Sequence, residues 1–481
     1  MNKFSPKEQD ELLKEYFTDQ KCRMLGIIIG SVLILLMAIL IIILNATHKN
    51  KIYENEKILQ GYVPVNSIIA KYRIDNPSQN ILLFNDSYTN LIHTLRIDGN
   101  KLNNVTHEYT FDTPGDHTVK MSFKKALRSS EKLFADCENL IEVNLANLTS
   151  ERISSTVEMF GGCTNLINVD FTGFDSSNVK NASYMFHNCS SLYTLDFHGF
   201  QVNELKDISG LFYGCTNLST IHFNYFYAGK VINMSKLFYE CKSLEEVTLY
   251  PFTTKSAIDM SYMFYGCSSL KTIDQYFDTS AVTNMSSMFE GCHQLQNISL
   301  VNFITYNVED FSFMFKDCYS LISLDIRNFD AYNATTMNGM FKNCISLENI
   351  NISNINYYNL TDMGDMFNNC TSLLEINMEN FYTENLIYMN GMFSDCTSLE
   401  QLNMTNFSTS NVQDMSYLLN ECNNLKYIDF SSFETFKVEK YDNIFNGLPD
   451  AGLFIYNSET FNKTILDLLP NSWEKNDIKN S

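Results

Sequence analysis

Cysteine recurs in this 481-residue chain at a nearly fixed interval. From Cys137 onward, successive cysteines are 26 residues apart, except for an interval of 25 residues between Cys267 and Cys292. A repeat of this length predicts a solenoid, in which every coil repeats one supersecondary unit and stacks on its neighbours. The cysteine ladder consists of Cys137, Cys163, Cys189, Cys215, Cys241, Cys267, Cys292, Cys318, Cys344, Cys370, Cys396 and Cys422.

Apolar residues keep the same interval as the cysteines. Phe stands three residues before most of them, and Leu stands three residues after each of them. In the segment NMSSMFEGC, Met285, Met288, Phe289 and Cys292 are spaced as on one face of a helix. A residue that favours the N-cap position, commonly Asn or Asp, stands eight residues before most of the cysteines. The pattern therefore predicts a helix of about two turns in each coil, too short to be stable without stacking.

A short strand is expected after each cysteine. The pattern L-x-x-[IVL]-[DN]-[LIFM] alternates apolar and polar residues, which is typical of a strand with one buried side. Stacked coils would join these strands into one long parallel sheet. The expected fold class is therefore α/β, a solenoid of about 12 coils with one short helix and one short parallel strand per coil.

The chain outside the repeats predicts several further segments. Residues 61–125 alternate in hydropathy between turn signals and predict a small β-rich N-terminal module, followed by the solenoid at 126–447. Residues 448–481 carry a changed repeat and predict a C-terminal cap that covers the open core. Residues 25–44 contain no charge and are long enough to predict a transmembrane helix, between a short polar head at 1–24 and a stalk at 45–60.

The apolar run at 25–44 also sets the expected localisation. Three basic residues stand close before it and three close after it, so the positive-inside rule gives no preferred orientation. Long domains cross membranes largely regardless of their charge. We therefore expect a single-pass membrane protein whose C-terminal solenoid lies outside the cell.

The cysteine ladder allows three interpretations. Neighbouring cysteines would stack about one strand spacing apart, which is compatible with disulfide bonds. A column of buried thiols that act as small hydrophobic groups is the favoured interpretation, because the same position recurs in every coil without a pairing pattern. Metal binding is the least favoured, because no column of histidines accompanies the cysteines.

A second column, seven residues after the cysteine, carries mostly Asp or Asn. Its side chains should point outward from the strands and form a polar, acidic face. This face is a candidate partner surface or a weak calcium site, although a solvated ladder that keeps the sheet soluble is the favoured interpretation. The candidate partner-facing residues are Asp170, Asp196, Asp274, Asp325, Asn351, Asn377, Asn403 and Asp429.

Catalysis and nucleic-acid binding are not expected. The chain contains no G-x-S-x-G, P-loop or H-E-x-x-H motif, and no long insertion interrupts the repeats. We therefore predict no enzyme activity and no catalytic, cofactor-binding or metal site. The net charge of −21 argues against nucleic acid, whose binders need a basic face. The 17 N-x-S/T sequons predict a glycoprotein if the chain enters a secretory lumen.

Segments such as DMSYMFYGCSSLKTID and NMSSMFEGCHQL resemble the BspA-type leucine-rich-repeat surface proteins. The resemblance covers about residues 126–475 and rests on the M-F-x-x-C-x-x-L register. It implies a leucine-rich-repeat-like solenoid on the cell surface of bacteria or parasitic protists, with roles in adhesion. It implies no catalytic residues.

The expected function is that of a membrane-anchored cell-surface protein whose solenoid recognises protein, matrix or cell partners without catalysis. The alternative is an intracellular or organellar membrane-anchored scaffold with the same solenoid. The repeat pattern does not identify a ligand, because repeat surfaces bind through shape and scattered side chains.

Overall fold

The computed structural model describes residues 66–480 apart from short gaps, and these residues belong to one compact unit, Val65–Ser481. The predicted polar head, transmembrane helix and stalk lie outside the described residues. The gaps are 149–152, 222, 224–225, 227–228, 249–252, 274–276, 301, 327–328, 354, 356 and 379.

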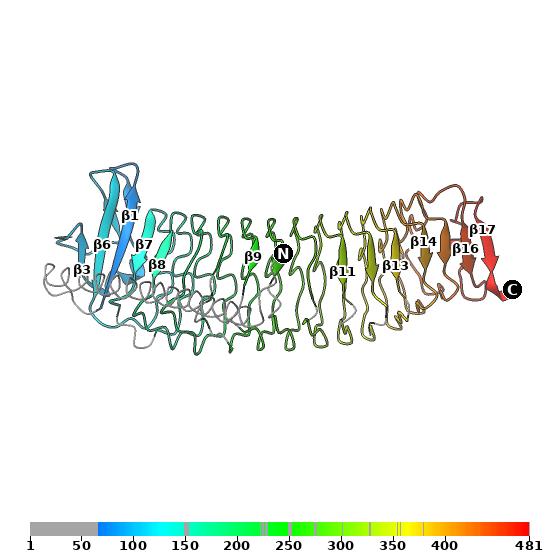
Figure 1. Ribbon diagram of the computed structural model, residues 1–481, viewed down its shortest axis with the longest axis horizontal. Coiled ribbons are helices and arrows are strands. Elements are labelled where there is room, and N and C mark those ends of the chain that lie inside the picture. The colour runs from blue at the N-terminus through cyan, green and yellow to red at the C-terminus, as the bar shows by residue number, and fades with distance from the viewer. Residues whose placement is uncertain are drawn as a thin grey trace, which may run out of the picture. The chain divides into compact units, whose positions relative to one another are not determined.

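The N-terminal part of this unit is a sheet that continues into the first coil (Figure 1). Its strand order is β4-β3-β6-β1-β7-β8, in which β1 pairs antiparallel with both β6 and β7, and β7 pairs parallel with β8. The antiparallel strands therefore cover the first coil. The strands are β1 (Ser67–Ile74), β3 (Ile92–Ile97), β4 (Asn100–Lys101), β6 (Gly115–Phe123), β7 (Leu140–Asn144) and β8 (Asn168–Asp170), with β2 (Asn80–Leu82) paired to β5 (Glu108–Thr110) and η1 (Asp86–Tyr88) between β2 and β3.

Along the solenoid, short parallel strands stack with a register of one repeat. Ile350 pairs with Ile376, for example, and Ile350 is buried whereas its neighbours Asn349 and Asn351 face outward. A strand with one inward apolar residue between two polar ones is what the sequence alternation predicts. These strands are β9 (Glu246–Val247), β10 (Thr272–Ile273), β11 (Ser323–Asp325), β12 (Asn349–Asn351), β13 (Glu375–Asn377), β14 (Gln401–Asn403) and β15 (Tyr427–Asp429).

The C-terminal end is closed by a modified coil. The strands β16 (Leu453–Tyr456) and β17 (Glu474–Asp477) extend the parallel sheet, and η2 (Ile478–Asn480) follows them. Between them lies α2 (Lys463–Leu466), which buries Ile465. Trp473 is also buried, and its indole N–H donates a hydrogen bond to the Pro449 carbonyl at 2.8 Å.

A second parallel ladder runs along the residue eight positions before each cysteine. Eleven single bridges connect successive coils, from Ser155–Asn181 to Asp414–Lys440. The sequence predicts helix N-caps at these positions. In the structure the Asp207 carboxylate does accept the Ser209 N–H at 2.9 Å, but it closes a turn and not a helix.

The prediction of a helix in every coil is wrong. Between each bridge and its cysteine the chain forms overlapping turns, such as that closed by the Cys344 N–H on the Phe341 carbonyl at 3.0 Å. Alternate N–H groups instead bond the next coil, as Phe341 does to the Met366 carbonyl at 2.8 Å. The left-handed residues Gly339 and Asn343 interrupt any continuous right-handed helix. The fold is therefore a β-solenoid of about 11 turns, and α2 is the only α-helix among the described residues.

The predicted membrane localisation is also contradicted. Within residues 66–480, gaps excepted, the structure contains no helix with the length and apolar character needed to cross a bilayer. This finding conflicts with a single-pass membrane protein and with a membrane partner held through one helix. The segment at 25–44, on which that prediction depends, lies outside the described residues.

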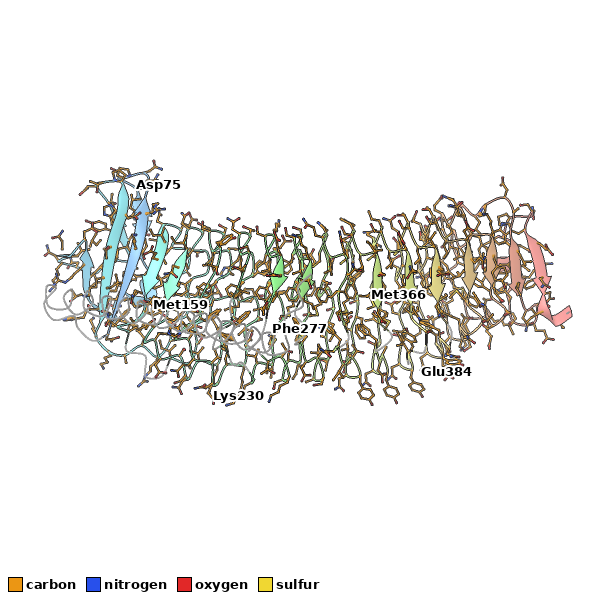
Figure 2. The ribbon with its side chains drawn as sticks, in the orientation of Figure 1. Asp75, Met159, Lys230, Phe277, Met366 and Glu384 are labelled. Carbon is orange, nitrogen blue, oxygen red and sulfur yellow. The ribbon has the colours of Figure 1, made fainter. Side chains whose placement is uncertain are left out.

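Stacked columns of identical side chains form the core. The Phe315, Phe341 and Phe367 rings stack at centroid separations of 5.6 Å and 5.4 Å. Figure 2 shows Met366 inside the outline of the coils, whereas Glu384 projects from the lower edge. A column of buried hydroxyl groups, which was not predicted from the sequence, lies beside the core. The Thr383 hydroxyl, for example, donates to the Ser408 carbonyl of the next coil at 3.0 Å.

Candidate partner-binding surface

The predicted Asp/Asn column lies at the ends of the parallel strands. Asp170, Asp325, Asn351, Asn377, Asn403 and Asp429 are the last residues of β8, β11, β12, β13, β14 and β15. Asp196 lies outside a named strand, and Asp274 is among the residues that the structure does not describe. Asp429 is buried, whereas Asp196, Asp325, Asn377 and Asn403 are exposed.

Many of these side chains have a structural role at the strand end. The Oδ1 atom of Asn351 accepts the Ser353 N–H at 2.9 Å, and that of Asn403 accepts the Thr405 N–H at 3.1 Å. Asp170, Asp196 and Asp429 accept the N–H two residues later in the same way, at 2.9 to 3.0 Å. Each bond forms a turn that ends the strand. One oxygen of these side chains is therefore occupied, and only the remaining polar atoms can contact a partner.

Three members of the column meet in a groove on the strand face. Asn351, Asn377 and Asn403 line it together with Glu375, and its volume is about 640 Å³. Parallel pairing at a register of one repeat places these asparagines beside one another, because each occupies the same position in its coil. The groove therefore spans three adjacent coils.

Other groove residues are outside the predicted column. Asn349, Thr405 and Asn406 also line the groove. The position of Asn349, five residues after the cysteine, was available from the alternation, because outward residues flank each inward one. Asn406 stands ten residues after its cysteine, in the loop after β14, and Asn recurs at this position in several coils, as at Asn302 and Asn380, so the repeat pattern contains a signal that the predicted column did not use.

The groove presents polar atoms that the rest of the described chain does not use. The side chains of Asn349, Glu375 and Asn406 make no hydrogen bond or ion pair within the described residues, and the same holds for the amide NH₂ groups of Asn351 and Asn403. An asparagine amide offers both donors and acceptors, as a peptide backbone does. The groove is therefore suited to hydrogen bonding with another polypeptide.

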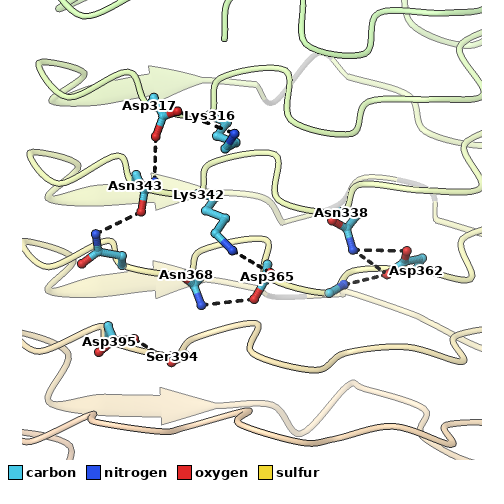
Figure 3. A network of polar contacts seen from close by, with 12 residues as sticks. Lys316, Asp317, Asn338, Lys342, Asn343, Asp362, Asp365, Asn368, Ser394 and Asp395 are labelled. Carbon is cyan, nitrogen blue, oxygen red and sulfur yellow. Dashed lines mark hydrogen bonds and ion pairs between the residues drawn. The ribbon is translucent and has the colours of Figure 1, made fainter. Parts of the chain in front are cut away.

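The turn segments differ, because their polar side chains bond to one another across coils (Figure 3). The Lys342 ammonium lies 2.8 Å from Asp365, and the Asn343 amide donates to Asp317 at 2.7 Å. Asn338 donates to Asp362 at 3.3 Å. These polar groups therefore satisfy one another across the coils.

The cysteine ladder lies inside the solenoid. All twelve cysteines are buried and free. The Cys344 thiol donates to the Phe315 carbonyl of the preceding coil at 3.1 Å, and the thiols from Cys163 to Cys422 repeat this bond. Burial raises the pKa of the Cys370 thiol to about 12. A thiol that stays protonated at neutral pH is a poor nucleophile and a poor metal ligand.

No arrangement suited to a metal ion is found in the described part of the chain. There, no three His, Cys, Asp or Glu side chains converge in a group that could hold one. The described carboxylates of the Asp/Asn column stand on different coils, and those of Asp170, Asp196 and Asp429 are bonded to their own turns.

Comparison with known proteins identifies a repeat family. The family model described as "Mycoplasma protein of unknown function, DUF285" matches residues 128–249, 232–353 and 344–457. These successive matches support the predicted repeat family, although BspA-type proteins are not named by the match. No curated protein matches the chain.

Several solved structures are similar to parts of the chain. The Toll–Spatzle complex of Drosophila gives 14% identity and a TM-score of 0.26, over 57% of this chain and 37% of that one. The functional domain of InlJ from Listeria monocytogenes, described as including a cysteine ladder, gives 10% identity and a TM-score of 0.22, over 62% of this chain and 65% of that one. The pneumococcal vaccine antigen PcpA gives 14% identity and a TM-score of 0.20, over 62% of this chain and 84% of that one. The chain thus spans little more than a third of the Toll chain.

Proposed function

Because this chain belongs to the DUF285 family of repeat proteins, we propose that its solenoid is a protein-binding module whose strand face holds the partner. The observation that carries this proposal is the groove across β12, β13 and β14. It combines a volume of about 640 Å³ with amide and carboxylate groups that have no partner in the described residues. An extended segment of another protein offers the matching backbone donors and acceptors.

The partner's expected charge follows from the chain's own. A net charge of −21 attracts positively charged proteins and repels negatively charged ones. Glu375 places one such charge in the groove itself. The favoured partner is therefore a protein with an extended, neutral to basic segment.

The biological role that we propose for this binding is adhesion, in the sense of holding a protein or matrix component without transforming it. The resemblance of the repeats to BspA-type proteins supports this role. The many similar coils support it as well, because a long solenoid offers a large surface to one partner.

The test begins with a photo-reactive amino acid in place of Asn377. Partners that become cross-linked are identified by mass spectrometry and are then tested against the unmodified protein by biolayer interferometry. In the double variant Asn351→Arg/Asn403→Arg we expect at least about a tenfold loss of affinity, because long cations fill the groove and repel a basic segment.

The matched control is Asn203→Arg/Gln413→Arg, which adds the same charge at exposed positions outside the groove. Its affinity should stay within about twofold of the unmodified protein, because salt screens exposed charges that do not touch the partner. Equal losses in both variants would show that net charge, and not the groove, governs binding.

A further inference from the structure

A second groove lies where the N-terminal sheet joins the first coil. Residues 124–129 connect β6 to that coil and line the groove along its length. Ser87 and Tyr88 of η1 line it as well, together with Leu91, and its volume is about 910 Å³. This groove shares no residue with the strand-face groove and is independent of the function proposed for it.

The charge of this groove is opposite to that of the chain. Lys124, Lys125 and Arg128 line it, and no carboxylate does. Lys124 bonds the Asn90 carbonyl at 2.7 Å, whereas the cationic groups of Lys125 and Arg128 have no partner within the described residues. Residues 66–134 hold nine Lys and Arg against seven Asp and Glu, although the chain as a whole carries −21. The groove is therefore a basic site on an acidic protein.

The backbone of the same segment adds hydrogen-bond donors. The carbonyl of Lys125 accepts the Asn66 amide at 2.7 Å, and that of Arg128 accepts the Ser154 N–H at 3.3 Å. The N–H groups of residues 125–129 bond no acceptor in the described structure. The fold thus uses the carbonyls of Lys125 and Arg128, whereas the N–H groups of residues 125–129 have no acceptor within the described residues.

The groove also has an apolar part. Leu91 is 46% exposed although it stands beside the buried residues Tyr88 and Leu127. An inorganic anion would leave this leucine uncovered. A peptide that carries both carboxylates and an apolar side chain would cover it and would also supply backbone carbonyls to the free N–H groups.

We propose that this groove binds an extended acidic peptide segment of a partner protein, with carboxylates on Lys125 and Arg128 and an apolar side chain on Leu91. Charge complementarity selects the segment, because two unpaired cations in a groove without carboxylates favour acidic side chains. The solenoid then has two recognition sites of opposite preference, one at its N-terminal end and one on its strand face.

The experiment uses the full chain and a short fluorescein-labelled peptide in which glutamate and leucine alternate. The reference peptide carries glutamine in place of every glutamate. Fluorescence anisotropy should show binding of the acidic peptide only. Lys125→Glu/Arg128→Glu should weaken that binding at least about tenfold, because it replaces two attractive contacts by repulsive ones.

The matched control is Lys463→Glu/Lys475→Glu, which makes the same change of charge in the C-terminal cap and should leave the affinity unchanged. Leu91→Ser should weaken binding by about threefold or more, because it removes the apolar contact. Equal binding of both peptides, or equal losses in the groove and cap variants, would overturn the proposal. Displacement of the peptide by inorganic phosphate, together with no effect of Leu91→Ser, would also overturn it and would identify a simple anion site.

Discussion

At the scale of single residues, the cysteine side chain joins neighbouring coils through a thiol–carbonyl hydrogen bond inside an apolar core. Cys344 donates to Phe315 at 3.1 Å, and Cys370 donates to Phe341 at 3.2 Å. Cysteine suits this position because it is small, apolar and still a weak donor. Burial favours the neutral thiol, which raises the pKa of Cys370 and of Cys422 to about 12.

These pKa values predict alkaline destabilisation. In the unfolded chain the thiols ionise near pH 9, whereas in the folded chain they stay protonated to a higher pH. Their contribution to stability is therefore complete below about pH 9 and is lost as the pH rises toward the folded pKa. Each thiol lowers the free energy of unfolding by roughly 1.4 kcal/mol per pH unit in this window. Urea midpoints should change little up to about pH 9 and fall steeply above it.

Two comparisons check this cause. The double variant Cys370→Ala/Cys422→Ala should show a shallower decline with pH than the unmodified chain. In a Cys22→Ser background, Ellman's reagent should label no ladder cysteine at pH 8 until denaturant is added. Rapid labelling of the folded protein would contradict the buried ladder.

The sequence predicts the location of the Asp/Asn column better than its role. The alternation places Asn351 and Asn403 correctly at the outward ends of strands. The alternation does not show that their side-chain oxygens accept hydrogen bonds from the Ser353 and Thr405 N–H groups, because the turn after the strand depends on backbone geometry. Asn406 lines the groove from the loop after β14, at a position ten residues after the cysteine where Asn recurs, but the prediction considered only the position seven residues after it.

At the scale of elements, the turn segment before each cysteine replaces the expected helix. Met285, Met288, Phe289 and Cys292 are all buried, as helical spacing predicts, because the overlapping turns direct the same residues inward. Burial spacing therefore does not distinguish the two structures. The signal that could have done so is glycine five residues before the cysteine, as at Gly391, since glycine is unfavourable inside a helix.

The substitution Gly391→Ala tests this element. Gly391 has a φ of +60°, and a Cβ atom there would meet the Asp365 carboxylate. Backbone strain and the clash should together lower the free energy of unfolding by about 1–3 kcal/mol. Urea unfolding followed by circular dichroism measures the change.

Gly229→Ala is the matched control. A Cβ atom at Gly229 would lie at ordinary contact distance, 3.4 Å, from the Thr253 methyl group. The expected change is below about 0.5 kcal/mol, and a gain is possible because alanine restricts the unfolded chain. A loss at Gly229 as large as that at Gly391 would refute the left-handed turn as the cause.

At the scale of the whole molecule, stability is the sum of contacts between neighbouring coils. The strand pairs and the single bridges both connect positions one repeat apart, as in Ile350–Ile376 and Thr336–Asp362. Such a molecule behaves as a one-dimensional array in which each coil supports only those beside it. The period of the sequence predicts that the repeats stack, because they are of nearly equal length, but the α/β coil predicted with it is wrong.

Removal of one complete coil should therefore preserve the fold. Deletion of residues 319–344 joins Cys318 to Ile345 and keeps every column in register. We expect a folded protein with a sheet-type circular dichroism spectrum and resistance to proteolysis. Deletion of residues 319–331 removes half a coil, sets polar positions against the core, and should give a protease-sensitive chain. If both deletion variants fold, stability does not depend on the register of one repeat between neighbouring coils.

The coil-to-coil register also determines how such a protein can change over generations. The interval of 25 residues between Asp259 and Asn284 still closes a bridge, so small differences in loop length are absorbed within a coil. Gain or loss of one repeat in the gene would add or remove a whole coil while both capped ends stay intact. The number of coils thereby sets the length of the solenoid, and it can change without altering either proposed binding groove.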